Sequence, residues 1–355
     1  MILYEKLNRR QLLGLTLPLL ARFPLKAQSS RAADIIAQSS VIDMLGLLTL
    51  NWPLLDRWQL DPDSFCKSDF QKLRDSGITV FHPAVAFESP ESYEITRQWF
   101  AKWNRLISQH ADCFLRVDVP ADIARAKAEG KIGIILGMQD ANHLRTLEDL
   151  DAFYAMGQRL TQLTYNSTNR LGAGCMAKRA GLTAFGQDVV ARMNKIGMAI
   201  DISHCGEATS LDAIAASNKP VLITHSNCRA LAPGVARCKP DDVIVAAARK
   251  GGVIGLTGVR HFVRATDPVT IEDALDHFDH VVKIAGIEHV GIGSDTDLDG
   301  RDSGSGPLRY DIAGLNHKNR VHELAEGLIR RGYTDEHIGL VLGGNFHRAL
   351  TEIWS

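Results

Sequence analysis

Eight short apolar runs, each followed by a segment whose apolar residues have helical spacing, constrain the fold more than any other feature of this sequence. A strand followed by a helix, repeated along a chain, predicts a parallel sheet, and runs that are apolar throughout indicate strands buried on both faces. The predicted strands are 41–45, 78–85, 132–138, 160–166, 198–203, 221–224, 253–257 and 290–294. The predicted helices include 90–115, 147–159, 184–196, 210–216, 240–250 and 271–285.

No linker or change of composition separates the eight units, and this favours closure into one barrel over a division into two domains. A chain of 355 residues, 45% of them hydrophobic, can bury the core that such a barrel needs. The predicted fold class is therefore α/β, a single (β/α)8 TIM-type barrel over residues 28–355. A doubly wound open sheet is the alternative, but no glycine-rich phosphate loop follows the first strand.

Charge and cysteine usage exclude two classes of function. The 40 basic and 41 acidic residues leave a net charge of -1, without the basic excess that binding to a phosphate backbone requires. The six cysteines include no CxxC pair, so a thiolate metal cluster is not expected and the pairing of the cysteines stays open. We expect a small-molecule substrate and no nucleic-acid partner.

The first 27 residues have the organisation of a twin-arginine export signal. Arg9 and Arg10 precede an apolar run that ends at Ala21, and a small-residue cleavage site follows at Ala27. The apolar run is too short for a permanent membrane span. The sequence therefore predicts a periplasmic or otherwise exported protein, with an amphipathic N-terminal helix as the alternative interpretation.

Polar residues that follow the predicted strands mark a candidate site, because catalysis in such barrels takes place at the carboxyl ends of the strands. His204 follows the fifth strand, His225 the sixth and Asp295 the eighth. Neutral imidazole is a good zinc ligand, and catalytic zinc usually has three protein ligands and one open position. We therefore predict His204 and His225 as metal ligands and Asp295 as a ligand or proton shuttle. The structural alternatives are hydrogen-bonded core histidines and a helix-capping aspartate.

Several ordered segments resemble one known family. The stretch 181–204, ending in Asp201-Ile202-Ser203-His204, and the stretch 220–227, which contains His225, are similar to the two metal-histidine segments of the membrane (renal) dipeptidases, peptidase family M19. Segments 239–244, 289–295 and 342–346 extend the resemblance, which runs from about residue 41 to the C-terminus.

The resemblance implies a (β/α)8 barrel with two zinc ions bridged by a carboxylate, in which a metal-activated water cleaves a dipeptide. By the same resemblance, His204 and His225 correspond to ligands of the second zinc, and Asp295 to a residue that binds the first zinc and handles the proton. Arg237 corresponds to an arginine that pairs with the carboxylate of the substrate. Tyr165 falls where relatives have a histidine that polarises the scissile carbonyl, and a phenol can donate that hydrogen bond.

Three positions depart from the family pattern. Leu45 and Leu47 stand where the family has a histidine and an aspartate, and Gln139 stands in place of the bridging glutamate. The expected site therefore holds one Zn²⁺ per chain, bound by His204, His225 and one carboxylate or amide. The candidates for this third ligand are Asp295, Gln139 and Asp140.

Three functions follow as hypotheses. The first is a zinc-dependent dipeptidase-type hydrolase that acts on a dipeptide or a related small amide. The second is an exported dipeptidase-like protein with a degenerate metal site that binds a peptide-like ligand without hydrolysis. The third is an enzyme that uses the same pocket for a non-hydrolytic tailoring step on an exported peptide. A homodimer, common among relatives, is a further expectation.

Overall fold

The computed structural model describes residues 30–302, 309–315 and 317–355, and Arg31–Ser355 form one compact unit. The predicted export signal, residues 1–27, lies outside the described residues. None of the described helices is long and apolar enough to cross a membrane.

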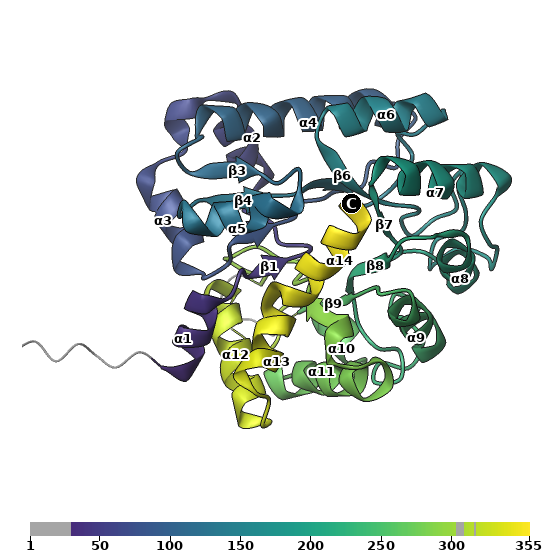
Figure 1. The fold of residues 1–355 in the computed structure, drawn as a ribbon. Helices are drawn as coiled ribbons and strands as arrows, with labels where there is room; N and C mark the ends of the chain where they lie inside the picture. The colour runs from purple at the N-terminus through teal and green to yellow at the C-terminus, as the bar shows by residue number, and fades with distance from the viewer. Residues whose placement is uncertain (1–29, 303–308, 316) are drawn as a thin grey trace, which may run out of the picture. The chain divides into compact units, whose positions relative to one another are not determined.

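A ring of parallel strands forms the centre of the unit (Figure 1). Strand β1 pairs with both β2 and β10, so the first and last strands of the chain are neighbours. Strands β4 and β5 are separated only by Ile135 and together complete the ring. Strand β4 pairs with β2 on one side, and β5 pairs with β6 on the other. The ring strands are β1 Ile42–Asp43, β2 Val80–Phe81, β4 Ile132–Ile134, β5 Leu136–Met138, β6 Gln158–Gln162, β7 Ala199–Asp201, β8 Val221–Ser226, β9 Ile254–Leu256 and β10 Val290–Ile292. The predicted barrel is confirmed, with the predicted run 132–138 divided into two pairing segments.

One additional strand corrects the sequence prediction for 90–115. The helix in this region, α4, spans Ser92–Gln109, and Phe114–Arg116 form strand β3 alongside β4. Apolar residues at helical spacing continue across the boundary, so periodicity alone did not separate the two elements. The predicted helix 147–159 is also too long, because Gly157 adopts a φ of 104° and β6 begins at Gln158.

Helices surround the strands in chain order (Figure 1). Helix α7 illustrates why they form where they do: the Thr183 side chain accepts a hydrogen bond from Gly186 N at its start, and Gly197, with a φ of 73°, ends it. The α-helices are α1 Arg31–Gln38, α2 Trp52–Leu60, α3 Lys67–Asp75, α4, α5 Pro120–Ala128, α6 Leu147–Ala155, α7 Ala184–Ile196, α8 Glu207–Ala216, α9 Asp241–Arg249, α10 Arg260–Val263, α11 Ile271–Ala285, α12 Arg320–Arg330, α13 Asp335–Gly339 and α14 Asn345–Trp354.

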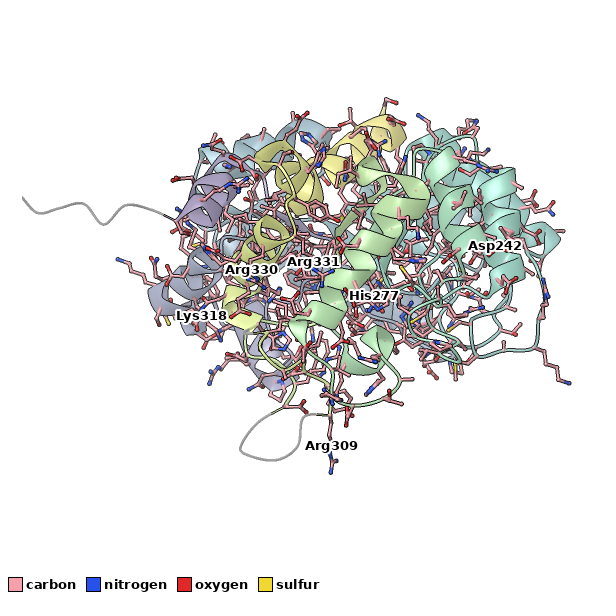
Figure 2. All side chains as sticks on the ribbon, turned by 90° about the horizontal axis from the view of Figure 1, so that it is seen from below. Asp242, His277, Arg309, Lys318, Arg330 and Arg331 are labelled. Atoms are coloured by element: carbon pink, nitrogen blue, oxygen red, sulfur yellow. The ribbon has the colours of Figure 1, made fainter. Side chains whose placement is uncertain are left out.

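Ion pairs join neighbouring helices of this outer layer. Arg331, which directly follows α12, donates to Asp276 (2.7 Å) and Asp279 (2.5 Å) on α11, and Arg330 donates to Glu272 (2.7 Å). Figure 2 shows the two arginines beside α11. These partly exposed pairs align α12 with α11 and contribute little stability individually.

Helix α14 covers the end of the barrel where the strands begin. Its residues Phe346, Leu350 and Ile353 belong to one buried cluster with the interior residues Ile42 and Leu222. In Figure 1 this helix crosses the centre of the ring. Because one end of the barrel is closed in this way, a ligand can enter only at the carboxyl ends of the strands.

Candidate active site

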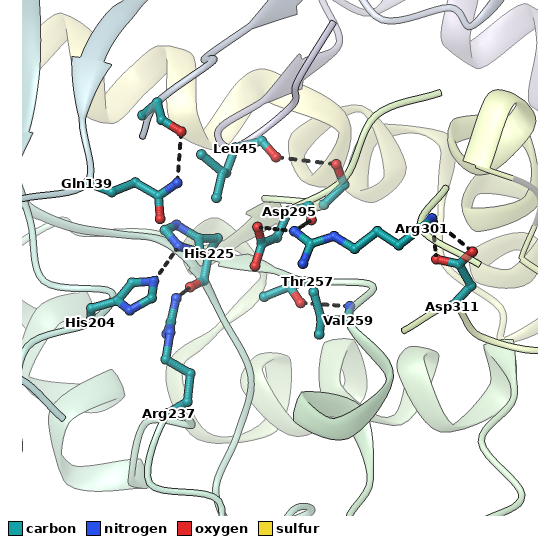
Figure 3. A network of polar contacts seen from close by, with 12 residues as sticks. Leu45, Gln139, His204, His225, Arg237, Thr257, Val259, Asp295, Arg301 and Asp311 are labelled. Carbon is teal, nitrogen blue, oxygen red and sulfur yellow. Dashed lines mark hydrogen bonds and ion pairs between the residues drawn. The ribbon is translucent and has the colours of Figure 1, made fainter. Parts of the chain in front are cut away.

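A cavity of about 870 Å³ opens at the carboxyl ends of the strands. Five residues predicted from the sequence line it, namely Gln139, Tyr165, His204, Arg237 and Asp295. His225 lies one layer deeper on β8, is fully buried and contacts His204. The barrel therefore brings together residues from the carboxyl ends of different strands, and Figure 3 shows Gln139, His204, His225 and Asp295 around one space.

The two histidines face each other through their Nε2 atoms, which are 3.1 Å apart. The Nδ1 atom of His204 lies 2.8 Å from Oδ1 of Asn166, and that oxygen also accepts from the Cys175 thiol. Because Oδ1 is an acceptor, His204 carries its proton on Nδ1 and has a lone pair on Nε2.

The same tautomer follows for His225 from a buried chain of hydrogen bonds. Asp201 accepts from the hydroxyl groups of Thr224 (2.7 Å) and Ser203 (2.6 Å) and from the backbone N–H groups of both residues. Because the Thr224 hydroxyl group donates its proton to Asp201, the Thr224 oxygen accepts a hydrogen bond from Nδ1 of His225 at 2.8 Å. Two Nε2 lone pairs then point at each other across 3.1 Å.

Two facing lone pairs at this distance require a cation between them. Burial, followed by the nearby Arg237 guanidinium, lowers the pKa of both His204 and His225 well below the usual value. A proton is therefore not the shared cation near neutral pH. Two imidazole nitrogens bound to one tetrahedral zinc are about 3.3 Å apart, given Zn–N bonds of about 2.0–2.1 Å. The observed separation fits two ligands of a single zinc ion.

Other zinc ligands are scarcer than the sequence predicted. Over residues 30–302, 309–315 and 317–355, no group of three or more His, Cys, Asp or Glu side chains is placed to hold a metal ion. Gln139 donates its amide N–H to the carbonyl of Ala84 (2.8 Å), and Figure 3 shows its Oε1 on the side that faces the imidazoles. Gln139 thus remains a candidate for a third position through a neutral oxygen.

Asp140 does not reach the cavity. Its carboxylate accepts from the backbone N–H of Phe87 (2.6 Å) and of Asn142 (3.0 Å), and its side chain is fully buried. These bonds hold the loop that follows β5, so the inward turn that a ligand role would need does not occur.

Thr224→Val is expected to weaken zinc binding by about 10- to 100-fold, because His225 loses the acceptor that fixes its tautomer and ring orientation. Competition against a chelator of known affinity measures this change. Thr164→Val is the matched control, since Thr164 is also fully buried near a strand end but its hydroxyl group bonds to the Ala173 carbonyl and to Cys205 and not to an imidazole. Equal zinc affinities of the two variants would contradict the proposed relay.

Asp295 is paired with an arginine that the sequence did not single out. Arg301 donates from Nη2 to the carbonyl oxygen of Asp295 (2.7 Å) and to its Oδ1 (3.1 Å), and Asp311 holds the backbone N–H of Arg301 (Figure 3). Burial raises the pKa of Asp295, and the Arg301 guanidinium partly offsets that rise. No strand end or motif marks Arg301, because it lies in an irregular segment after β10.

Leu45 and Leu47 occupy the positions where the resemblance expects charged ligands. Both are buried, and Leu47 forms part of the cavity wall. The cation beside Asp295 is therefore the guanidinium of Arg301, bounded by apolar side chains. This half of the pocket does not fit a second metal ion.

Arg237 and Tyr165 surround the histidine pair. Arg237 is 5% exposed and donates to the carbonyl oxygens of Ser203 (2.6 Å) and His225 (2.7 Å), while its Nε has no partner among the described residues. The ring of Tyr165 stacks on His204 with centroids 4.1 Å apart. Burial, and then the charge of Asp295, raises the pKa of Tyr165, so its phenol remains a hydrogen-bond donor at neutral pH.

Comparisons with known proteins identify the fold and the family of this chain. A dipeptidase of Schizosaccharomyces pombe is 33% identical over 223 residues, which are 60% of this chain and 51% of the relative, so the match spans about half the length of that curated relative. The crystal structure of an amidohydrolase from Pseudomonas aeruginosa is 28% identical, with a TM-score of 0.79, over 91% of this chain and 99% of that one. The probable dipeptidase PvdM of the same organism shares the fold at 21% identity, with a TM-score of 0.76, over 91% and 97%.

A family model covers nearly the whole described region. The model of the membrane dipeptidases matches residues 29–354. The resemblance found in the sequence is thereby confirmed, and the chain belongs to the membrane dipeptidase family, peptidase family M19.

Proposed function

We propose that this protein hydrolyses the amide bond of a dipeptide or a related small peptide-like substrate, with one zinc ion held by His204 and His225. The observation that carries the proposal is the pair of Nε2 atoms 3.1 Å apart, on His204 at the wall of the cavity and on His225 behind it, in a cavity that also contains the Asp295 carboxylate. When bound, zinc supplies a Lewis acid that activates water and polarises a carbonyl oxygen.

The side chains of the cavity then have separate tasks. Arg237 lines the cavity and binds the substrate carboxylate through the N–H groups of its guanidinium that do not donate to Ser203 and His225. The phenol of Tyr165 donates a hydrogen bond to the carbonyl oxygen as charge develops on it. Asp295 takes a proton from the attacking water and delivers it to the departing amine.

Arg301 lowers the pKa of Asp295 against the effect of burial and so favours its carboxylate form, and this predicts a pH effect. Burial raises the pKa of Asp295 and the guanidinium lowers it, so Arg301→Met raises that pKa further. Because only the carboxylate form accepts a proton, the acidic limb of the kcat/KM profile moves to higher pH in the variant. Arg264→Met, which removes an exposed arginine that pairs with Asp273, serves as the control. An unchanged acidic limb in Arg301→Met would contradict this role.

A second candidate function is binding or tailoring of a peptide-like ligand without hydrolysis. Specific observations favour it: Leu45 is buried and Leu47 lines the pocket, Gln139 offers an amide in place of a carboxylate, and Arg301 pairs with Asp295. A pocket with fewer anionic groups holds zinc less firmly and removes protons less effectively. Under this function the cavity retains its affinity for peptides but does not turn them over.

Hydrolysis of a dipeptide panel by the zinc-loaded protein distinguishes the two functions. The panel contains both stereoisomers at each position, and release of free amino acids is the signal. The proposal expects turnover that is lost in His204→Ala/His225→Ala. Binding of a dipeptide by calorimetry, with no amino acid released over many hours, would favour the second function.

Export and self-association also belong to the proposal. The Arg9-Arg10 pair and the apolar run that follows it support transport by a twin-arginine route to the periplasm or beyond. A homodimer stays a prediction that sedimentation of the purified protein can test.

A further inference from the structure

The mouth of the cavity is rimmed by exposed apolar side chains. Among the described residues, five large hydrophobic side chains are markedly exposed, and three of them line this cavity: Trp52 (43% exposed), Met176 (69%) and Tyr310 (43%). Single exposed apolar residues are ordinary, but several that line one pocket indicate a binding surface. We call these three residues the apolar rim.

The three residues come from distant parts of the chain, and each is tied to ordered structure. Trp52 is the first residue of α2, which is capped by Asn51. The backbone N–H of Met176 donates to the carbonyl of Asn166 (3.1 Å), the residue that orients His204. The carbonyl of Tyr310 accepts from Arg260 N (2.8 Å), and its ring packs edge-on against His261. The rim is therefore positioned relative to the imidazole pair.

The cavity is larger than a dipeptide requires. Its volume of about 870 Å³ lies in the upper part of the range of about 300–1,000 Å³ that is typical of pockets for drug-sized ligands. Leu47, Leu50 and Val85 add further apolar wall to a cavity whose charged residues are Glu88, Arg237, Asp295 and Arg301. The shape suits a ligand with a polar peptide-like head and a substantial apolar arm.

We propose that the apolar rim is an outer subsite that binds an alkyl or aromatic arm of the substrate, while the peptide-like head lies at Arg237 and the two histidines. This inference rests on the proposed function for the identity of the head. The rim has the composition that such an arm needs, because burying apolar surface supplies affinity without a matched charge. The preferred substrate is thus an amphipathic peptide-like amide rather than a small polar dipeptide.

Calorimetry with a series of X-alanine dipeptides, in which X has an unbranched alkyl side chain of one to ten carbons, tests the subsite directly. The zinc-loaded Asp295→Asn variant is used so that binding is measured without turnover. Affinity should rise by about two- to fourfold for each added methylene once the chain reaches the rim, as expected for buried CH₂ groups. In the Trp52→Ser/Met176→Ser/Tyr310→Ser background this dependence should disappear, with affinity for the shortest peptide unchanged.

Leu60 and Val119 provide the matched control, because they are the other two markedly exposed large hydrophobic residues among those described and do not line the cavity. Leu60→Ser/Val119→Ser should keep the full dependence on chain length. A flat series in the parent protein, or a dependence that survives the triple substitution, would overturn the subsite. If the dependence on chain length survives the triple substitution and the substitution also abolishes a dimer, the rim contacts a second copy of the chain instead. If affinity rises with chain length only when the rim is intact, and the parent protein hydrolyses no dipeptide, the result supports the subsite and refutes the proposed hydrolysis.

Discussion

Asp295→Asn is expected to lower kcat by about 100- to 10,000-fold, the usual contribution of a positioned general base. The substitution removes the proton acceptor and keeps the size of the side chain. It also suits the backbone, because Asp295 has a φ of 57° and asparagine tolerates this left-handed region well. We therefore expect a folded protein with nearly unchanged KM, measured by steady-state kinetics on the best dipeptide of the panel.

The control for this experiment is Asp299→Asn. Asp299 lies four residues further along the chain, is exposed and pairs with Lys72 at the surface. Its loss should leave kcat within about twofold, as for most exposed ion pairs. If the two variants have similar activity, Asp295 is not the base.

Arg237→Lys is expected to lower kcat/KM by about 10- to 100-fold, mainly through KM, because a lysine cannot reproduce the forked contact of a guanidinium with a carboxylate. A hydrogen bond to a charged group contributes about 1.5–3 kcal/mol, which corresponds to this range. Steady-state kinetics with a dipeptide and with its C-terminal amide measures the effect. The variant should lose its preference for the free carboxylate.

Arg229→Lys provides a matched control. Arg229 also donates to two backbone carbonyls, those of Cys238 (3.0 Å) and Ala236 (3.4 Å), but it lies outside the catalytic cavity. Any loss that arises only from weaker support of the backbone should therefore appear in both variants. An intact preference for the carboxylate in Arg237→Lys would assign Arg237 a purely structural role.

Most of the barrel could be predicted from the sequence because its strands are short apolar runs separated by helices of clear periodicity. Strand β3 could not, since Phe114–Arg116 continues the apolar spacing of α4 and pairs with β4 alone. The division of the run 132–138 into two strands could not be predicted either. Its first half pairs with β2 and its second half with β6, and such a change of pairing partner does not alter the composition of the run.

Some residues of the candidate site could also be predicted from the sequence, and others could not. His204, Tyr165, Arg237 and Asp295 could be placed at the cavity because a strand end or a family motif precedes each of them. Arg301 could not, since it approaches Asp295 through a left-handed turn that no motif encodes.

The hydrogen-bond partners of the imidazoles were also beyond the sequence. Asn166 lies in the loop after β6, and Thr224 directly precedes His225 on β8, but nothing in the sequence indicates which ring nitrogen each of them contacts. Side-chain tautomers depend on such contacts, so the strongest argument for the metal became available only with the structure.

The central claim is that the facing Nε2 atoms of His204 and His225 share one zinc ion, and elemental mass spectrometry of the purified protein tests it most directly. The account predicts about one zinc per chain, in line with a mononuclear catalytic site, and none in His204→Ala/His225→Ala. The variant His337→Ala/His347→Ala, which alters α13 and α14 instead, should retain the metal. Absence of zinc from the parent protein, or an unchanged zinc content after removal of both cavity histidines, would contradict the account.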